Sequence, residues 1–544
     1  MKKFALNFVN ERLLIILISI GFTLWGAGFI HKSSFITLDG RRSFSLFDDA
    51  MISMRYAWNF SHGNGLVWNP GEYVQGYTNL LMTLLMSLAT LVFSKTVAVL
   101  FIQISGIVFM LLVAFLTMKI ADHVIRSPDK GSRAFVRILS FLCGLTYYPL
   151  AYWSLTGMET GLLTVLILSG IWTCFKHLQF QDQKMLLLSA VFFGLAFLTR
   201  NESIIIVPLV WGYILWETIE TGAHRKHLKW LGASVGLYLG IAAGQLLFQY
   251  LYYGDYFPNT YTLRLTGMAL FDRLQNGIGF ITLFLRETAL IIALAVLGTS
   301  IDFKKNKMVL MLCIVTLIGY QVYVGGDAWN YWRMLAPIIP LAMILNIEAL
   351  FVGFNWLLNR FLPEKIPARL NRPGSLVAVL VTILILPGIL LVNARFLKEV
   401  FFRDKPFQSR SNHVNVNIAI ALNDLLREDA TIGVFWAGSI PYYTDRKSID
   451  FLGKSDRYIA RLPPDMSGDI ASMGMTSLPG HNKYDLNYSI VFLQPTYVQG
   501  FTWGGQDVSS WAAHKYVEVL YKGNTLYLLK DSPSVFWSKL EDLQ

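Results

Sequence analysis

The chain has 544 residues, of which 54% are hydrophobic and only 15% are charged. Soluble globular domains carry about 25% charged residues, so this composition excludes an ordinary soluble protein. The net charge of +11 could indicate a nucleic-acid-binding protein. However, most of the basic excess lies in short loops between apolar blocks, which indicates a membrane topology and no nucleic-acid partner.

The hydrophobic residues form blocks close to the roughly 20 residues that a membrane helix needs. The first block, Leu13–Ile30, follows Lys2, Lys3 and Arg12. Its apolar core is long and no clear cleavage site follows, so we interpret it as a retained span rather than a signal peptide. We expect a mainly α-helical, polytopic membrane protein with about eleven spans, over residues 13–30, 97–120, 135–153, 161–175, 185–199, 203–216, 230–252, 278–301, 308–324, 334–354 and 375–393.

The short basic segments set the expected orientation. They hold 18 Lys/Arg and 8 Asp/Glu, over residues 1–12, 122–133, 176–184, 217–229, 302–307 and 360–373. Basic short loops mark the cytoplasmic face, so the N-terminus is expected inside and everything after Asn393 outside. Residues 77–93 are also apolar, but a span there would place 122–133 outside. We therefore expect 77–93 to lie at the interface.

The chain after residue 393 changes composition. Residues 394–544 contain turn clusters and short β-like runs, at Thr431–Trp436, Tyr488–Leu493 and Tyr516–Leu529. Gly523–Asn524 divides the last run and predicts a hairpin. We therefore expect a membrane module over 1–393 and an extracytoplasmic α/β domain over 394–544.

The cysteine pattern predicts neither disulfides in the tail nor a metal site. Cys143, Cys174 and Cys313 lie in or beside apolar spans, and the tail has no cysteine. No Cys/His cluster has zinc-ligand spacing. We expect no metal and no cofactor.

The longest polar loop, residues 31–76, contains adjacent carboxylates, Asp48 and Asp49, before a helix-compatible run. The positive end of a helix favours ionised carboxylates. One of two adjacent acids can act as a general base toward a hydroxyl while the other orients a partner. A helix cap with a solvated neighbour is the structural alternative.

Other outer-end residues are candidates for the same site. Glu159, Asp255 and Asp327 lie in outer turns or loops, with Arg264 and Arg333 close to the last two in sequence. Arginines pair with phosphate oxygens, and aromatic residues are dense at the same edges. The combination indicates an anionic lipid-linked substrate with a sugar head group.

Loop 31–76 is similar to the first outer loop of GT-C-fold glycosyltransferases, which take sugars from polyprenyl-phosphate donors. Its fuller string resembles the branch that contains the mycobacterial terminal arabinofuranosyltransferase and its Gram-negative relatives. The matching residues in the loop are Asp48-Asp49-Ala50, Ile52-Ser53, Arg55-Tyr56-Ala57, Gly65-Leu66-Val67, Asn69-Pro70-Gly71-Glu72 and Gly76-Tyr77-Thr78-Asn79. Further matches are Gly157-Met158-Glu159-Thr160, Leu198-Thr199-Arg200, Tyr253-Gly254-Asp255, Pro258-Asn259-Thr260, Gly325-Gly326-Asp327, Pro441-Tyr442-Tyr443 and Asp450-Phe451-Leu452-Gly453. Asn201 departs from the branch, which often has proline there.

The resemblance implies an inverting transfer to a glycan or protein acceptor outside a bacterial cytoplasmic membrane, with no obligatory metal. Arabinofuranose is the best-known donor sugar of the branch. An Asp of the pair Asp48 and Asp49 would be the base. The residues expected to bind the donor phosphate or sugar are Arg55, Glu159, Arg200, Asp255, Arg264, Asp327 and Arg333.

Two other classes of function fit a polytopic membrane protein. A lipid or glycolipid transporter would need ionisable residues inside its spans, whereas these candidates are mostly at the outer ends. A non-catalytic cell-envelope assembly protein would use the tail as a binding module, and the acids would be dispensable. The sequence leaves the sugar, the acceptor and the choice between Asp48 and Asp49 open.

Overall fold

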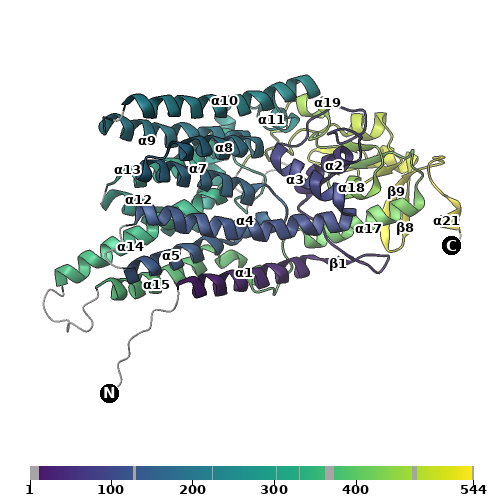
Figure 1. Cartoon of the computed structure of the whole chain (residues 1–544). Helices are drawn as coiled ribbons and strands as arrows, with labels where there is room; N and C mark the ends of the chain where they lie inside the picture. Colours follow the sequence, from purple (N-terminus) through teal and green to yellow (C-terminus); the bar gives the residue numbers. More distant parts are fainter. Residues whose placement is uncertain are drawn as a thin grey trace, which may run out of the picture.

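The computed structural model of the chain describes residues 11–125, 130–222, 224–301, 303–329, 331–361, 373–467 and 475–541. Long, roughly parallel helices form a bundle, and short helices and strands gather at one end of it (Figure 1). The bundle elements are α1 Glu11–Ser33, α4 Lys95–Val124, α5 Lys130–Leu145, α6 Tyr148–Leu155, α7 Thr160–Phe180, α8 Gln183–Thr199, η1 Asn201–Ile205, α9 Val207–Glu220, α10 His224–Tyr253, α12 Leu270–Ile301, α13 Lys305–Val324, η2 Ala336–Ile338, α14 Ile339–Phe361, α15 Pro373–Val392, η3 Ala394–Phe396 and α16 Leu397–Val400.

The helices agree with a multi-pass membrane protein. Eight helices among the described residues are long and apolar enough to span a membrane, or up to ten if two bent pairs each count as one. The bent pairs are α5 with α6, at 57°, and the end of α15 with 394–400, at 59°. The predicted span 185–199 corresponds to the shorter helix α8. Each predicted span therefore coincides with a helix or a bent pair.

Four of the six predicted basic segments meet at one end of the bundle, whereas most of the other two, 1–12 and 360–373, lies outside the described residues. Lys305, the first residue of α13, pairs with Glu217 of α9 at 3.2 Å. Asn306 donates to the backbone oxygen of His123 at 2.9 Å, and the side chains of Gln183 and His227 lie 3.3 Å apart. These contacts bring four of the loops between predicted spans together, as an alternating topology requires. Which side of the membrane they face stays a prediction.

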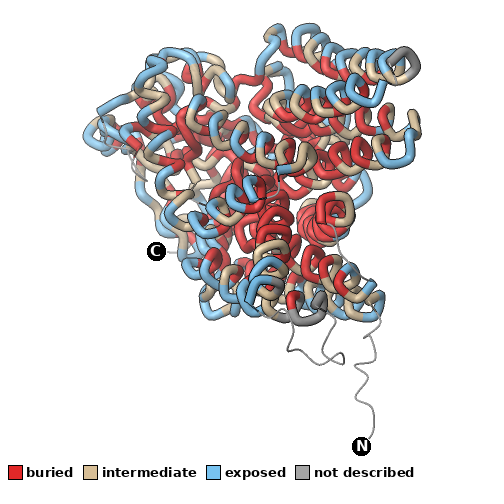
Figure 2. Tube along the Cα trace, turned by 90° about the vertical axis from the view of Figure 1, so that its left-hand side faces the viewer, coloured by how far each residue is buried: buried red, intermediate tan, exposed pale blue. Residues whose placement is uncertain are grey.

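Burial is concentrated inside the bundle. Figure 2 views the bundle along its helices, with buried segments gathered in the middle and exposed ones on the outer helices. Only 17% of the apolar window of α1 and 22% of that of α10 are buried, against 83% for α7. Such exposed apolar surface on peripheral helices is expected where lipid, not water, surrounds the protein. Gly106 permits a close approach of α4 to α6, because a Cβ there would lie 2.2 Å from the backbone oxygen of Ser154.

Between the bundle and the tail lie the strand pair β1 Phe35–Ile36 and β2 Arg42–Ser43 and the short helices α2 Asp48–Ser61, α3 Leu80–Val92 and α11 Asn259–Leu265. Helix α3, which lies within the predicted interfacial segment 77–93, has 13 residues. At 1.5 Å per residue it is about 20 Å long, shorter than the roughly 30 Å hydrocarbon core. It packs against α2. Its position relative to a bilayer stays a prediction.

The tail contains a mixed five-stranded sheet with the order β4-β3-β5-β9-β8. Strand β3 runs parallel to β4 and β5, whereas β9 runs antiparallel to β5 and β8. The predicted α/β character of the tail is confirmed. Its elements are α17 Ser409–Leu425, β3 Ile432–Val434, α18 Ser439–Thr444, β4 Ser448–Asp450, α19 Arg457–Arg461, η4 Asn487–Phe492, β5 Tyr497–Val498, β6 Thr502–Trp503, β7 Gln506–Asp507, α20 Ser509–Lys515, β8 Tyr516–Tyr521, β9 Asn524–Leu529 and α21 Ser538–Glu541.

The sequence predicted one tail hairpin correctly and one strand wrongly. Lys522 and Gly523, both with positive φ (47° and 75°), form the tight turn between β8 and β9, as a two-residue hairpin requires. The run Tyr488–Leu493 is instead helical, as η4. Leu486 and Ile490, four residues apart, are both buried, so a helical spacing places the apolar residues inward.

Candidate active site

Helix α2 begins directly at the paired aspartates. Phe47 is extended (φ −60°, ψ 146°), and its N–H donates to the Thr156 oxygen at 2.9 Å, which fixes the start of the helix on the bundle. Both carboxylates are therefore in the first turn, where the helix dipole favours negative charge. Consecutive helical residues point about 100° apart, so Asp48 and Asp49 face different surroundings.

Asp49 faces a cavity of about 300 Å³ between the bundle and the tail. Ile52 and Ser53, three and four residues further along α2, line the same cavity, as the helical repeat predicts. The structure also brings several predicted site residues to this cavity, namely Glu159, Arg200, Arg264, Asp327 and Arg333. The structure therefore places most of the polar candidates from separate loops around one cavity.

Two arginines and two aspartates are linked across the cavity. Arg333 donates from Nη1 to Asp49 Oδ2 at 2.9 Å and from Nη2 to Asp327 Oδ1 at 3.1 Å. Arg264 Nη2 lies 3.5 Å from the same Asp327 oxygen and donates to the Gly326 oxygen at 2.6 Å. Asp327 Oδ2 and Arg333 Nε are buried and have no hydrogen-bond partner among the described residues. The network thus keeps unused hydrogen-bonding capacity in the cavity.

The tail supplies a further cation, Lys454, whose Nζ forms an ion pair with Asp49 Oδ1. Burial of Asp49 favours its neutral form, but Lys454 and Arg333 outweigh it and hold the pKa of Asp49 well below its usual range. Asp49 is therefore a carboxylate at neutral pH, with a cation on each oxygen.

Asp48 faces the tail instead of the cavity. Its Oδ1 accepts from the Ser439 N–H at 3.3 Å, and its Oδ2 is buried without a partner among the described residues. Burial raises the pKa of Asp48 to about 7, with Lys454 lowering it and Asp49 adding to the rise. A Cβ at Gly438 would lie 2.2 Å from the backbone oxygen of Asp48. Only glycine therefore lets the tail sit this closely on the start of α2.

A second ion pair lines the cavity on the bundle side. Arg200 donates from Nη1 to Glu159 Oε1 at 2.6 Å, and its Nε donates to Glu202. The other oxygen of Glu159 accepts from Asn79 at 3.0 Å. Glu159 is buried, with 1% of its side chain exposed. The ion pair with Arg200 offsets part of the cost of burying this carboxylate.

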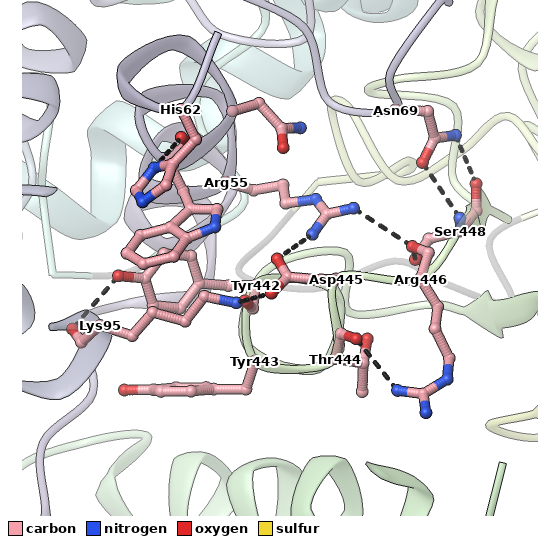
Figure 3. A network of polar contacts seen from close by, with 12 residues as sticks. Arg55, His62, Asn69, Lys95, Tyr442, Tyr443, Thr444, Asp445, Arg446 and Ser448 are labelled. Carbon is pink, nitrogen blue, oxygen red and sulfur yellow. Dashed lines mark hydrogen bonds and ion pairs between the residues drawn. The ribbon is translucent and has the colours of Figure 1, made fainter. Parts of the chain in front are cut away.

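Arg55 and Asp255, both predicted to bind the donor, lie outside this cavity. Arg55 follows Asp48 by seven residues, so it shares the tail-facing side of α2. It donates to Asp445 Oδ1 at 2.8 Å and to the Trp68 oxygen at 3.0 Å, and Lys95 converges on the same carboxylate (Figure 3). Asp255 is half-exposed and pairs with Arg457 at 3.2 Å.

Lys454 and His481 line the cavity, and the sequence analysis named neither. A signal for Lys454 existed, because it directly follows the resembling string Asp450-Phe451-Leu452-Gly453. Asp450 Oδ2 accepts from the Ser455 N–H at 2.7 Å and its Oδ1 from the Leu452 N–H at 3.0 Å. These bonds fold the loop that presents Lys454. His481 carries no comparable sequence signal.

The described residues contain no group of three or more His, Cys, Asp or Glu side chains placed to hold a metal ion. Cys143, Cys174 and Cys313 are buried and unpaired. The cavity's polar lining is thus built from carboxylates, arginines, a lysine and a histidine, which can bind an anion and accept a proton.

A comparison with solved structures shows the fold. The chain is similar to the crystal structure of ArnT from Cupriavidus metallidurans bound to undecaprenyl phosphate, with a TM-score of 0.53 and 11% identity, over 80% of this chain and 85% of that chain. It is also similar to the Archaeoglobus fulgidus oligosaccharyltransferase in the apo form, with a TM-score of 0.51 and 11% identity, over 82% of this chain and 65% of that chain. The chain therefore has the GT-C fold of polytopic membrane proteins.

Sequence comparisons add little to this result. A protein-family profile described as a domain of unknown function (DUF8728) matches residues 404–527, within the tail. No curated protein matches the chain.

Proposed function

We propose that this protein is a membrane glycosyltransferase that transfers a sugar from a polyprenyl-phosphate donor to an acceptor outside the cytoplasm. The observation that carries the proposal is Asp49, a carboxylate facing the cavity with cations on both sides. The ArnT structure similar to this chain holds undecaprenyl phosphate, which supports a lipid phosphate as the ligand of the same fold here.

The donor phosphate would bind to Arg264, Arg333 and Lys454. A guanidinium offers a planar fork that matches phosphate oxygens, and the buried Nε of Arg333 has no partner among the described residues. The cavity lies between the outer ends of the spans and the tail. A lipid chain could therefore extend along the exposed apolar bundle while its phosphate reaches these cations.

Asp49 would act as the general base. The acceptor hydroxyl attacks the anomeric carbon, its proton passes to Asp49, and the bond from the anomeric carbon to the phosphate oxygen breaks. The polyprenyl phosphate leaves as an anion, and attack from the opposite side inverts the centre. When the donor phosphate shares Lys454 and Arg333, Asp49 loses part of its stabilisation. Its pKa then rises toward the range that favours proton transfer.

The two aspartates would have different roles. Asp48 faces the tail and lies outside the cavity lining, so we assign it to positioning α2 against the tail rather than to proton transfer. Glu159 would hold Arg200 at the cavity wall. Arg55 and Asp255 receive no donor-binding role in this proposal.

We propose arabinofuranose as the donor sugar to test first, because the motifs of loop 31–76 resemble a branch with that specificity. The acceptor would be a cell-envelope glycan or a protein. The N-terminus and basic loops would face the cytoplasm of a bacterial inner membrane, and the tail would face the periplasm. Reporter fusions after residue 222 and after residue 404 test this topology, because a cytoplasmic reporter signal at 404 contradicts it.

The activity test uses the full chain in lipid nanodiscs with a panel of polyprenyl-phosphate sugars, including arabinofuranose, and envelope glycans as acceptors. Release of polyprenyl phosphate and inverted product linkage are measured. Removing a general base costs about 10² to 10⁴ in rate, so Asp49→Asn should lose that much. Asp255→Asn, an outer aspartate outside the cavity, is the matched control and should retain activity. Wild-type rates in Asp49→Asn contradict the proposed base, and no transfer from any donor contradicts the function.

A further inference from the structure

Two polar atoms in the cavity wall take no part in the ion network. They are Nε2 of His481, from the tail, and Nε1 of Trp329, from the loop between α13 and η2. Both atoms are buried, and neither has a hydrogen-bond partner among the described residues. Buried polar groups are nearly always paired in folded proteins, so a ligand group is the natural partner for each.

The backbone around His481 fixes the position of its ring. The His481 N–H donates to the Leu478 oxygen at 3.1 Å, and its backbone oxygen accepts from Trp503 Nε1 at 3.1 Å. The imidazole meets the Trp329 ring edge to face, with centroids 5.7 Å apart and an interplanar angle of 87°. His481 itself is 3% exposed. The two side chains with unpartnered nitrogens therefore lie side by side in the cavity wall.

His481 is a neutral imidazole at physiological pH. Burial, with help from Lys454, lowers the pKa of His481 to about 3, against a smaller opposing effect of Asp49. Nδ1 lies 3.4 Å from the Pro479 oxygen, an arrangement in which the ring proton is on Nδ1. Nε2 then offers a lone pair and can only accept a hydrogen bond.

Trp329 offers the complementary group, because an indole Nε1–H can only donate. The Trp329 ring also packs in a T-shaped arrangement against Phe47, with centroids 4.9 Å apart, which ties its position to the residue before the paired aspartates. An acceptor and a donor on adjacent aromatic rings match the hydroxyls of a sugar, which both donate and accept. A phosphodiester has no O–H to give to Nε2, so the phosphate would bind to the cations and not here.

We infer that His481 and Trp329 read the ring hydroxyls of the donor sugar, with His481 Nε2 accepting one hydrogen bond and Trp329 Nε1 donating one. This inference rests on the proposed function and assigns sugar specificity to a pair shared by the tail and the bundle. A sugar held by its hydroxyls at this wall and by its phosphate at Arg264, Arg333 and Lys454 would present its anomeric carbon near Asp49.

The test uses the full chain in nanodiscs with polyprenyl-phosphate arabinofuranose and its 2-deoxy, 3-deoxy and 5-deoxy derivatives. If the panel shows transfer of a different sugar, the monodeoxy derivatives of that sugar replace them. His481→Phe should lower kcat/KM for the complete donor by about 10- to 100-fold, because a hydroxyl loses its partner. For the one derivative that lacks this hydroxyl, the variant and the wild type should have similar kcat/KM. Trp329→Phe should also lower kcat/KM for the complete donor. It should match the wild type for the one derivative that lacks the hydroxyl bound by Trp329.

Two further measurements separate this role from a structural one. His481→Gln, which keeps a hydrogen-bond acceptor near the Nε2 position, should recover most of the activity. Affinity for undecaprenyl phosphate, which has no sugar, should be unchanged in His481→Phe. The matched control is His413→Phe, since His413 stacks on Phe35 at 4.9 Å and lies outside the cavity lining.

The outcomes distinguish this inference from the proposed function. A wild type that transfers none of the donor sugars contradicts both. An active wild type with an equally active His481→Phe overturns only the inference. The inference is also wrong if His481→Phe slows all donors by the same factor, if His481→Gln restores nothing, or if undecaprenyl phosphate binding falls with activity.

Discussion

Lys454, in the tail, forms an ion pair with Asp49, at the start of α2. The two residues are 405 positions apart in the chain. The tail therefore contributes a charged group to the cavity, whose other walls come from the membrane bundle and the helices next to it. The proposed donor site therefore includes the tail.

Replacing Lys454 with Met should weaken the binding of undecaprenyl phosphate by about 10- to 100-fold, because a hydrogen bond to a charged group contributes about 1.5 to 3 kcal/mol. Lys454→Arg, which keeps the charge, should recover part of the affinity. Lys522→Met is the matched control, since Lys522 pairs with Asp424 at 2.7 Å and 48% of its side chain is exposed. Unchanged binding in Lys454→Met would remove Lys454 from the phosphate site.

Asp48→Asn should stabilise the protein at pH 8. The pKa of Asp48 is about 7 in the folded protein, because the carboxyl is buried, and lower when unfolded. Between about pH 4 and 7 the folded state holds a proton that the unfolded state has released, so stability falls as pH rises through this window. Asparagine cannot ionise and avoids that loss. The advantage of the variant should grow from pH 5 to pH 8 in thermal unfolding.

Asp49→Asn gives the contrasting result in the same measurement. The pKa of Asp49 is depressed by Lys454 and Arg333, against the effect of burial. Its contribution to stability is present above the unfolded pKa of the carboxyl and is lost only as pH falls through the folded value. The Asn variant should therefore be less stable than the wild type throughout pH 5 to 8. If at pH 8 both variants were more stable than the wild type, or both less stable, the two carboxyls would not have the distinct environments described.

The sequence predicted the bundle well because lipid-facing helices have long apolar blocks that can be read locally. It predicted Glu159, Asp327 and Arg333 as site residues because each lies at an outer helix end, and alternating spans bring such ends together. It also named Arg55 as a donor-binding candidate. Arg55 lies outside the cavity, because the helical repeat places this residue with Asp48, on the side of α2 that faces the tail. The pairing of the tail with the bundle depends on long-range packing, for which no local pattern exists. His481 was missed for that reason. Lys454 directly follows the resembling string Asp450-Phe451-Leu452-Gly453, but only the packing of the tail on the bundle brings it to Asp49.

Glu159→Gln should destabilise the folded protein by about 1 to 3 kcal/mol, because the buried Arg200 guanidinium loses one of its charged hydrogen-bond partners. The Arg200 guanidinium would keep only Glu202 as a carboxylate partner. Thermal unfolding in detergent measures this change. Glu220→Gln is the matched control, since Glu220 is 51% exposed in its pair with Lys305 and exposed pairs contribute little to stability. Equal losses of stability in Glu159→Gln and Glu220→Gln would show that the buried pair of Glu159 contributes no more than an exposed pair.

Asp445→Asn tests how the tail is held on α2. Asp445 accepts from Arg55, whose side chain is 1% exposed, and from Lys95, at 16% (Figure 3). Its φ of 58° lies in the left-handed region, which asparagine tolerates, so the substitution removes charge without straining the backbone. Asp445 is itself 52% exposed, so solvent screens the pair. The expected loss is therefore about 1 to 3 kcal/mol, below that of a fully buried pair. Lys447→Ala, which breaks the exposed pair with Glu72, should change stability by less than about 0.5 kcal/mol.

Because Arg55 lies outside the cavity, transfer by the folded Asp445→Asn protein should stay within about tenfold of wild type, far from the 10² to 10⁴ loss expected on removing the base. A loss as large as that of Asp49→Asn would place the Arg55–Asp445 pair in the chemistry instead of in the joint between α2 and the tail.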